Sequence, residues 1–176
     1  MKFIVAFSFV LAAVGQVAHA QRPPKAPWAL EPQSTPSLSV PADLRRAVGG
    51  ELEYDDTEPM KGVAVDLDGD GIEDYLLQSA PSLCGNGGCV YVLCDGATRR
   101  KTGRFFGSPL VIQAERTHRY PNISTYSHLS AGSGAFTDYQ FDGTTYVVTS
   151  TRVLEGAALE RQAETVRRVP IWRPRQ

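Results

Sequence analysis

The chain has 176 residues, 42% of them hydrophobic and 21% charged, with 18 basic against 19 acidic side chains. A chain of this size can bury the core of one ordinary domain. A formal net charge of −1 argues against a dedicated nucleic-acid binder, so no nucleic-acid partner is expected.

Residues 1 to 20 are typical of a signal peptide. Lys2 precedes an apolar run from Phe3 to Val14, and Ala18-His19-Ala20 is a small-x-small cleavage site, so the mature chain is expected to begin at Gln21. The apolar run is too short for a stable membrane anchor, and no cysteine follows it to accept a lipid. We therefore expect an exported protein, periplasmic or secreted, with no membrane anchor.

Residues 21 to 50 are expected to form a proline-rich leader and a short helix. Six of the twelve prolines lie before residue 42, and proline interrupts both sheets and helices, so the leader is expected to stay out of any sheet. Trp28 would suit a recognition segment or spacer, but a disordered N-terminus is the preferred interpretation. A helix is predicted from about Ala42 to Val48, because Gly49-Gly50 ends it.

The most specific motif is the acidic loop Asp66-Leu67-Asp68-Gly69-Asp70-Gly71-Ile72-Glu73-Asp74. Carboxylates at loop positions 1, 3, 5 and 9 and a carbonyl at position 7 supply the oxygen ligands that Ca²⁺ prefers, and the glycine at position 6 allows a sharp turn. The alternative is an Asp-Gly-rich hairpin that binds no ion, because both residues are common in turns. The predicted ligands are the side chains of Asp66, Asp68, Asp70 and Asp74 and the carbonyl of Ile72.

Residues 51 to 155 are expected to form a β-rich domain. Short strands joined by short turns favour an antiparallel meander, so the predicted fold is mainly β (α+β), with a short N-terminal helix and a C-terminal helix. The predicted strands are Gly62 to Asp66, Asp74 to Ser79, Cys89 to Cys94, Gly103 to Phe106, Leu110 to Ala114, Ile123 to His128, Phe136 to Phe141 and Thr144 to Thr149.

Residues 156 to 176 are expected to form a helix followed by a basic tail. The helix is predicted from Gly156 to Arg168, lying on the sheet or its edge, with a narrow apolar side formed by Leu159, Ala163 and Val166. The tail from Pro170 to Gln176 mixes cations with an aromatic residue, which would suit an anionic surface. A solvated tail that can be deleted without loss of folding is the preferred interpretation.

All three cysteines lie within eleven residues of one another. A disulfide between Cys84 and Cys89 is predicted, because the four residues between them are flexible and strand alternation places Cys94 on the opposite face from Cys89. Cys94 would then be a buried free thiol. The alternatives are three small core residues or, least favoured, a zinc site, whose common spacings this pattern does not match.

The acidic loop between two predicted strands resembles the calcium loop of FG-GAP and related β-propeller blades, D-x-D-x-D-G-x-x-D. It is less similar to a true EF-hand, which requires flanking helices and a glutamate at position 12, where this chain has Leu77. Residues 61 to 95 also resemble a loose group of small exported bacterial proteins in which such a loop leads into a C-G-x-G-G-C turn. The resemblance implies calcium binding, whereas a single loop does not predict a complete propeller.

The predicted function is a non-catalytic exported binding module that contacts a protein or glycan, for instance as an inhibitor or immunity-like protein. The alternative is a small periplasmic or secreted hydrolase using His118 or His128, but neither histidine lies in a G-x-S-x-G, H-E-x-x-H or phosphate-loop motif. Tyrosines in strands are usually core residues, but they also contribute strongly to interfaces. The candidate contact residues are Tyr120, Tyr126 and Tyr139.

Overall fold

The structure is a computed structural model that describes residues 27–55 and 57–173. The predicted signal peptide and the predicted mature N-terminus, Gln21, lie outside these residues. Among the described residues, no helix combines the length and the apolar character needed to span a membrane.

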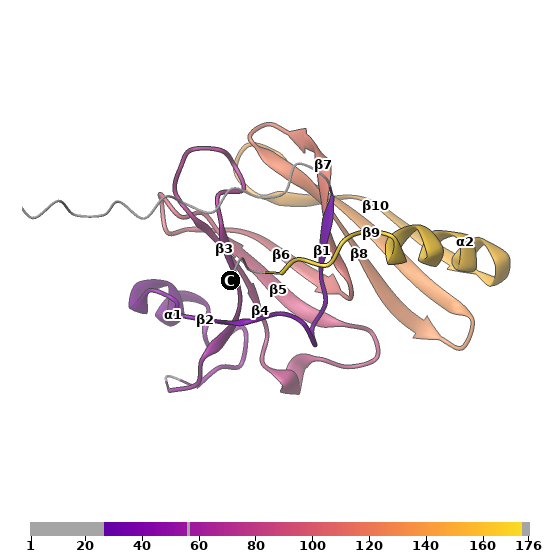
Figure 1. Cartoon of the computed structure of the whole chain (residues 1–176), viewed down its shortest axis with the longest axis horizontal. Helices are drawn as coiled ribbons and strands as arrows, with labels where there is room; N and C mark the ends of the chain where they lie inside the picture. Colours follow the sequence, from indigo (N-terminus) through magenta and orange to yellow (C-terminus); the bar gives the residue numbers. More distant parts are fainter. Residues whose placement is uncertain (1–26, 56, 174–176) are drawn as a thin grey trace, which may run out of the picture.

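Two antiparallel five-stranded sheets make up most of the chain, which confirms the predicted mainly β fold (Figure 1). The first sheet has the order β1-β7-β8-β9-β10 and the second the order β2-β3-β4-β5-β6. The first sheet consists of β1 (Trp28–Leu30), β7 (Leu110–Thr117), β8 (Tyr120–Ser130), β9 (Ser133–Phe141) and β10 (Tyr146–Glu155). The second consists of β2 (Ser37–Leu38), β3 (Met60–Val65), β4 (Asp74–Gln78), β5 (Cys89–Cys94) and β6 (Lys101–Gly107).

The main core is formed by side chains from both sheets, including Val65 and Tyr91 from the second and Ile123 and Phe141 from the first. Helix α1 (Ala42–Val48) has the predicted limits, and its Leu44 and Val48 bury a second cluster on the other face of the second sheet. A short 3₁₀ turn, Pro81–Leu83, precedes β5.

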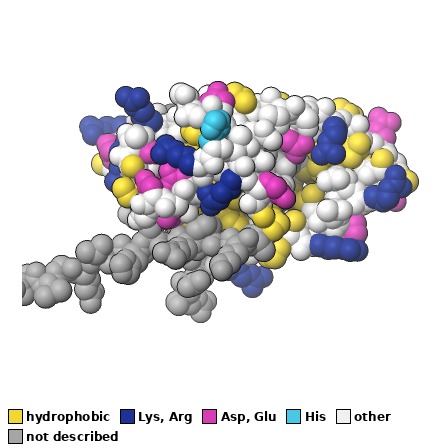
Figure 2. All heavy atoms as spheres, turned by 90° about the horizontal axis from the view of Figure 1, so that it is seen from above, with side chains coloured by type: hydrophobic (Ala, Val, Ile, Leu, Met, Phe, Trp, Pro, Cys, Tyr) yellow, Lys and Arg dark blue, Asp and Glu magenta, His cyan; other side chains and the backbone are white. Residues whose placement is uncertain are grey.

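Helix α2 (Gly156–Arg167) contacts β9 and β10 and has no fully buried residue. Its half-buried side chains include the predicted apolar side of Leu159, Ala163 and Val166. Figure 2 shows basic and acidic side chains interspersed over the visible face of the molecule, with no large patch of a single sign.

The expectation that the leader stays out of the sheets is wrong for residues 28–30 and 37–38, which form the edge strands β1 and β2. Pro27, Pro32 and Pro36 all lie outside the paired residues, so the ladders lose no donor to proline. Trp28 is only 2% exposed and belongs to the main core, so it is not an exposed recognition residue.

The expectation of a solvated C-terminal tail is also wrong. Trp172 is 5% exposed, and its ring centroid lies 4.8 Å from that of Trp28. The N–H of Ala29 donates to the Pro170 carbonyl at 2.9 Å, and the N–H of Trp172 donates to the Ala29 carbonyl at 2.8 Å. Burial of a large aromatic side chain outweighs the solvation of the neighbouring charges, so residues 170–172 are packed beside β1. Residues 174–176 lie outside the described residues.

Two of the tyrosines expected to be available for contacts are core residues. Tyr120 is fully buried and Tyr139 is 9% exposed, whereas Tyr126 is half-buried on the opposite face of the first sheet. Tyr126 lies six positions after Tyr120, so simple alternation would place both on one face. The register of the β7–β8 pair shifts within this stretch, between Ile112 and Arg116 of β7, so alternation does not hold across it.

Candidate metal centre

Three of the predicted carboxylates converge at the β3–β4 loop. Asp66, Asp68 and Asp74 each offer a carboxylate oxygen, and these oxygens lie within 4.8 Å of one another. Because β3 and β4 pair antiparallel, the hairpin brings the two ends of the loop together, and Val65 pairs directly with Asp74. This group could hold a metal ion.

The loop is folded by hydrogen bonds to its own aspartates. Asp66 accepts the N–H groups of Gly69 at 2.7 Å and Gly71 at 3.1 Å. Both glycines have a positive φ, of 88° and 90°, which residues with a Cβ rarely adopt. Asp74 Oδ2 accepts the N–H of Leu67 at 3.0 Å, which ties the end of the loop back to its beginning.

The fourth predicted carboxylate is not part of this group. Asp70 lies outside the three-carboxylate group, and its Oδ1 accepts the N–H of Ile72 at 2.7 Å. The Ile72 side chain is 46% exposed. The local turn at these residues therefore already satisfies one Asp70 oxygen.

Residues from two other hairpins complete the surroundings of the group. Gly96, in the β5–β6 turn, donates its N–H to Asp74 Oδ1 at 2.9 Å. The Tyr120 hydroxyl lies 3.0 Å from both Asp74 Oδ1 and Asp95 Oδ2. From the sequence, Asp95-Gly96 indicates only a turn, and no local pattern links Tyr120 to the loop.

Arg119 is the protein's own cation beside these carboxylates. Its Nη2 lies 2.5 Å from Asp95 Oδ2, and its Nη1 lies 3.1 Å from Asp68 Oδ2. The second contact is an ion pair but not a hydrogen bond. Asp68 Oδ2 is buried and has no hydrogen-bond partner among the described residues. The guanidinium also lies over the Tyr120 ring, 5.1 Å from its centroid.

The pKa values of two of the three carboxylates, Asp74 and Asp68, are raised. Burial raises the pKa of Asp74 to about 6, despite hydrogen bonds from the N–H groups of Gly96 and Leu67. Burial also raises the pKa of Asp68. For Asp95, burial is outweighed by hydrogen bonds from Thr98 and Tyr120 and by Arg119, so its pKa is lowered. A cation bound between Asp68 and Asp74 would favour their charged forms.

The two histidines of the alternative enzymatic interpretation lie at opposite ends of one strand. His118 is in the turn before β8, and His128 lies ten residues further along, near the end of β8. At roughly 3.3 Å per strand residue, about 30 Å separates them. A hydrolase site would therefore use one of them alone, His118 or His128.

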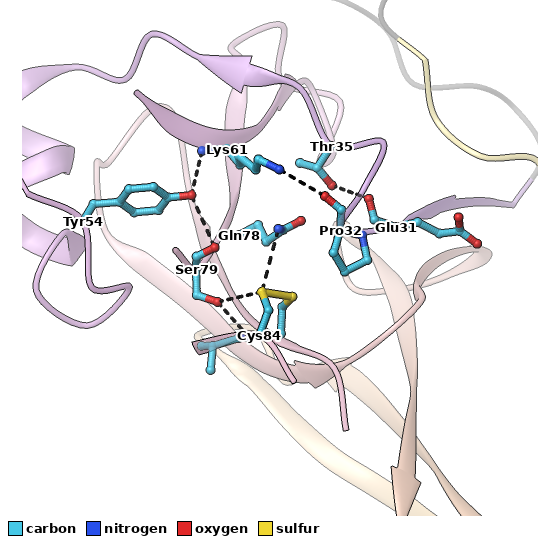
Figure 3. The surroundings of a disulfide bond; sticks show 10 residues. Glu31, Pro32, Thr35, Tyr54, Lys61, Gln78, Ser79 and Cys84 are labelled. Atoms are coloured by element: carbon cyan, nitrogen blue, oxygen red, sulfur yellow. Dashed lines mark hydrogen bonds between the residues drawn. A yellow bond between two sulfur atoms is a disulfide. The ribbon is translucent and has the colours of Figure 1, made fainter. Parts of the chain in front are cut away.

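The predicted disulfide between Cys84 and Cys89 is present, with an S–S distance of 2.06 Å. Figure 3 shows its surroundings, where the Ser79 hydroxyl lies 3.7 Å from Cys84 Sγ and the Gln78 amide lies 4.0 Å from it. Cys94 is free and buried, as predicted, and burial raises its pKa to about 11. The thiol is therefore protonated and unreactive at neutral pH.

Comparison of the chain with protein-family models, with curated proteins and with solved structures found no match.

Proposed function

We propose that the chain is an exported, non-catalytic binding module whose β3–β4 loop binds Ca²⁺ through Asp66, Asp68 and Asp74. The observation that carries this proposal is the convergence of three carboxylate oxygens within 4.8 Å, together with the burial of Asp68 Oδ2 without a hydrogen bond. Carboxylate oxygens are the ligands that Ca²⁺ prefers. The Arg119 guanidinium lies 3.1 Å from Asp68 Oδ2 but makes no hydrogen bond to it, so its charge compensates this buried oxygen only in part.

The proposed role of the ion is structural. The loop lies where the β3–β4, β5–β6 and β7–β8 hairpins meet, through the contacts of Asp74 with Gly96 and Tyr120 and of Asp68 with Arg119. A cation there would brace three hairpins at one end of the two sheets. The resemblance to FG-GAP calcium loops supports this assignment, and the signal-peptide pattern and the disulfide support export.

The proposed partner is a protein or a glycan. Large hydrophobic side chains on β6, β8 and β10 are exposed and therefore accessible to such a partner. These exposed residues are Phe106, Leu129, Val147, Val148 and Val153.

Calorimetric titration with Ca²⁺ after chelator treatment tests the metal site. We expect one site with a dissociation constant of roughly 10⁻⁵ to 10⁻³ M, weaker binding of Mg²⁺, and a melting temperature that rises with Ca²⁺. Asp68→Asn should abolish the heat. Asp142→Asn is the matched control, because Asp142 caps another Asp-Gly turn by accepting the N–H groups of Thr144 and Thr145.

The variant Arg119→Gln distinguishes two possibilities: a loop whose carboxylates bind a metal ion, and a loop whose negative charge is balanced by Arg119 alone. Arg119 is half-exposed, so removing its charge should strengthen Ca²⁺ binding by about 1 kcal/mol or less, roughly fivefold at most. No calcium heat in either the wild type or Arg119→Gln would refute the site. Asp70→Asn tests the fourth predicted carboxylate: an unchanged affinity would place Asp70 outside the coordination shell.

A further inference from the structure

Helix α2 and the outer face of the first sheet enclose a groove formed by two adjoining cavities of about 540 and 280 Å³. The two cavities share lining residues from the sheet and from the end of the helix. Their combined size is in the range of small-molecule sites, roughly 300 to 1,000 Å³. The shared residues are Pro109, Tyr126, Phe136, Val166 and Val169.

The middle of the groove is apolar. Its floor is the cross-strand pair Tyr126 and Phe136, whose ring centroids lie 5.0 Å apart. Ala163 and Val166 of α2 face this floor across the larger cavity. Because no α2 side chain is fully buried, the helix does not fill the space by itself, and an apolar occupant would remove more of these surfaces from water.

The larger cavity has a basic rim. Arg167, Arg168 and Arg173 line it, opposed by a single acidic lining residue, Glu31. Arg167 and Arg168 pair with the exposed Glu164 at 3.6 and 3.2 Å, and such pairs are weak in water. Within the described part of the chain, Arg173 makes no hydrogen bond or ion pair. The charge of this rim is complementary to an anionic group.

The far side of the smaller cavity is polar, and most of its polar side chains are hydrogen-bonded to one another. Asp138 accepts hydrogen bonds from Ser124 and Ser150, both at 2.7 Å, and pairs with Arg152 at 3.4 Å. Gln113 donates to the Ser124 hydroxyl at 3.0 Å. Of the polar side chains that line this cavity, the buried Thr125 hydroxyl has no hydrogen-bond partner among the described residues. A neutral hydroxyl cannot neutralise a charged head group, and Asp138 would repel an anion, so the charged group of an occupant belongs at the arginine rim.

We propose that this groove binds a free single-chain anionic amphiphile, with a carboxylate head at the arginine rim and a hydrocarbon chain between α2 and the aromatic floor. The three arginines favour an anion over a neutral or cationic head group. The apolar residues lie beneath the helix and not on an outer surface, which favours a detached chain over a membrane. This site is separate from the acidic loop and does not depend on calcium.

Calorimetric titration of the mature chain with octanoate and decanoate, below their micelle concentrations, tests the proposal. We expect saturable one-to-one binding that strengthens by up to about fourfold for each added methylene. Decyltrimethylammonium, which has the same chain and the opposite charge, should bind at least tenfold more weakly than decanoate. Equal affinity for the two head groups would overturn the assignment of the arginine rim.

Two pairs of variants locate the site. Ala163→Trp should fill the larger cavity and abolish decanoate binding, whereas Ala157→Trp, at an exposed position of the same helix, should not. Arg173→Gln should weaken decanoate binding several-fold and leave decanol binding unchanged, and the exposed Arg161→Gln should change neither. Melting curves check that each variant folds.

Three results would contradict the proposed binding site: no saturable decanoate binding to the wild type, full binding by Ala163→Trp, or equal losses in Ala157→Trp and Ala163→Trp.

Sedimentation with phosphatidylglycerol vesicles distinguishes a free amphiphile from a membrane lipid as the ligand. We expect no co-sedimentation. Binding to vesicles without binding to monomeric decanoate would replace the proposed free amphiphile with a membrane surface.

Discussion

Replacing Trp172 by alanine should destabilise the whole domain, although only four residues of the sequence follow it. Its side chain is 5% exposed and packs on Trp28 in the main core between the sheets. Trp28 belongs to the edge strand β1, which has only three residues. The tail and β1 therefore hold each other in place.

Truncation of a buried aromatic residue to alanine costs roughly 3 to 5 kcal/mol. Deleting residues 170 to 176 also removes the two backbone hydrogen bonds between the tail and Ala29, each worth roughly 0.5 to 1.5 kcal/mol. A domain of this size has a total stability of about 5 to 15 kcal/mol. Trp172→Ala should therefore remove a large part of it, and the deletion should remove more.

Urea denaturation followed by far-ultraviolet circular dichroism measures this effect without relying on the tryptophan signal. Trp172→Phe should lose less stability than Trp172→Ala, because it keeps an aromatic ring against Trp28. Arg173→Ala is the control at an exposed neighbouring position and should change the free energy of unfolding by less than about 0.5 kcal/mol. A loss below 1 kcal/mol in Trp172→Ala would show that the tail is not part of the core.

The bond between Cys84 and Cys89 closes only a short loop, so its reduction should cost about 2 kcal/mol of stability in urea titrations, and a loss above 5 kcal/mol would show a larger structural role. Cys94 should react with a thiol reagent only after unfolding, because it is buried with a pKa raised to about 11, and rapid labelling of the native protein would contradict this. Tyr120→Phe leaves Asp74 without the hydroxyl, and the same urea titrations should show a loss of roughly 1 to 3 kcal/mol; an unchanged midpoint would mean that the hydroxyl contributes nothing.

Local patterns predicted the regular elements because those elements are held by neighbours in the sequence. The strand Cys89–Cys94 and the helix Ala42–Val48 have the predicted limits. The edge strand Trp28–Leu30 pairs with residues 80 or more positions away, at Leu110–Ile112. Its proline-rich surroundings show no periodic pattern of apolar residues. Its place in the sheet depends on these long-range contacts, which a local sequence pattern cannot predict.

The same distinction applies to the candidate metal centre. The hairpin that brings Asp66 and Asp74 together is local, and the alternation of the aspartates predicts it. Asp95 and Arg119 reach the group only because the β5–β6 and β7–β8 turns meet the β3–β4 loop at one end of the sheets. Arg119 follows His118, which has a positive φ although it is not a glycine, so no simple sequence motif predicts the turn that positions Arg119.

The presence of Arg119 limits how strongly the loop can hold an ion. The loop is already ordered by hydrogen bonds to Asp66 and Asp74, so binding would require little further ordering of the backbone. A cation at Asp68 must compete with a guanidinium 3.1 Å away, which lowers the net gain from the carboxylate. A preformed loop with an internal competitor is suited to weak binding that becomes complete only in millimolar calcium, the concentration range typical of extracellular modules.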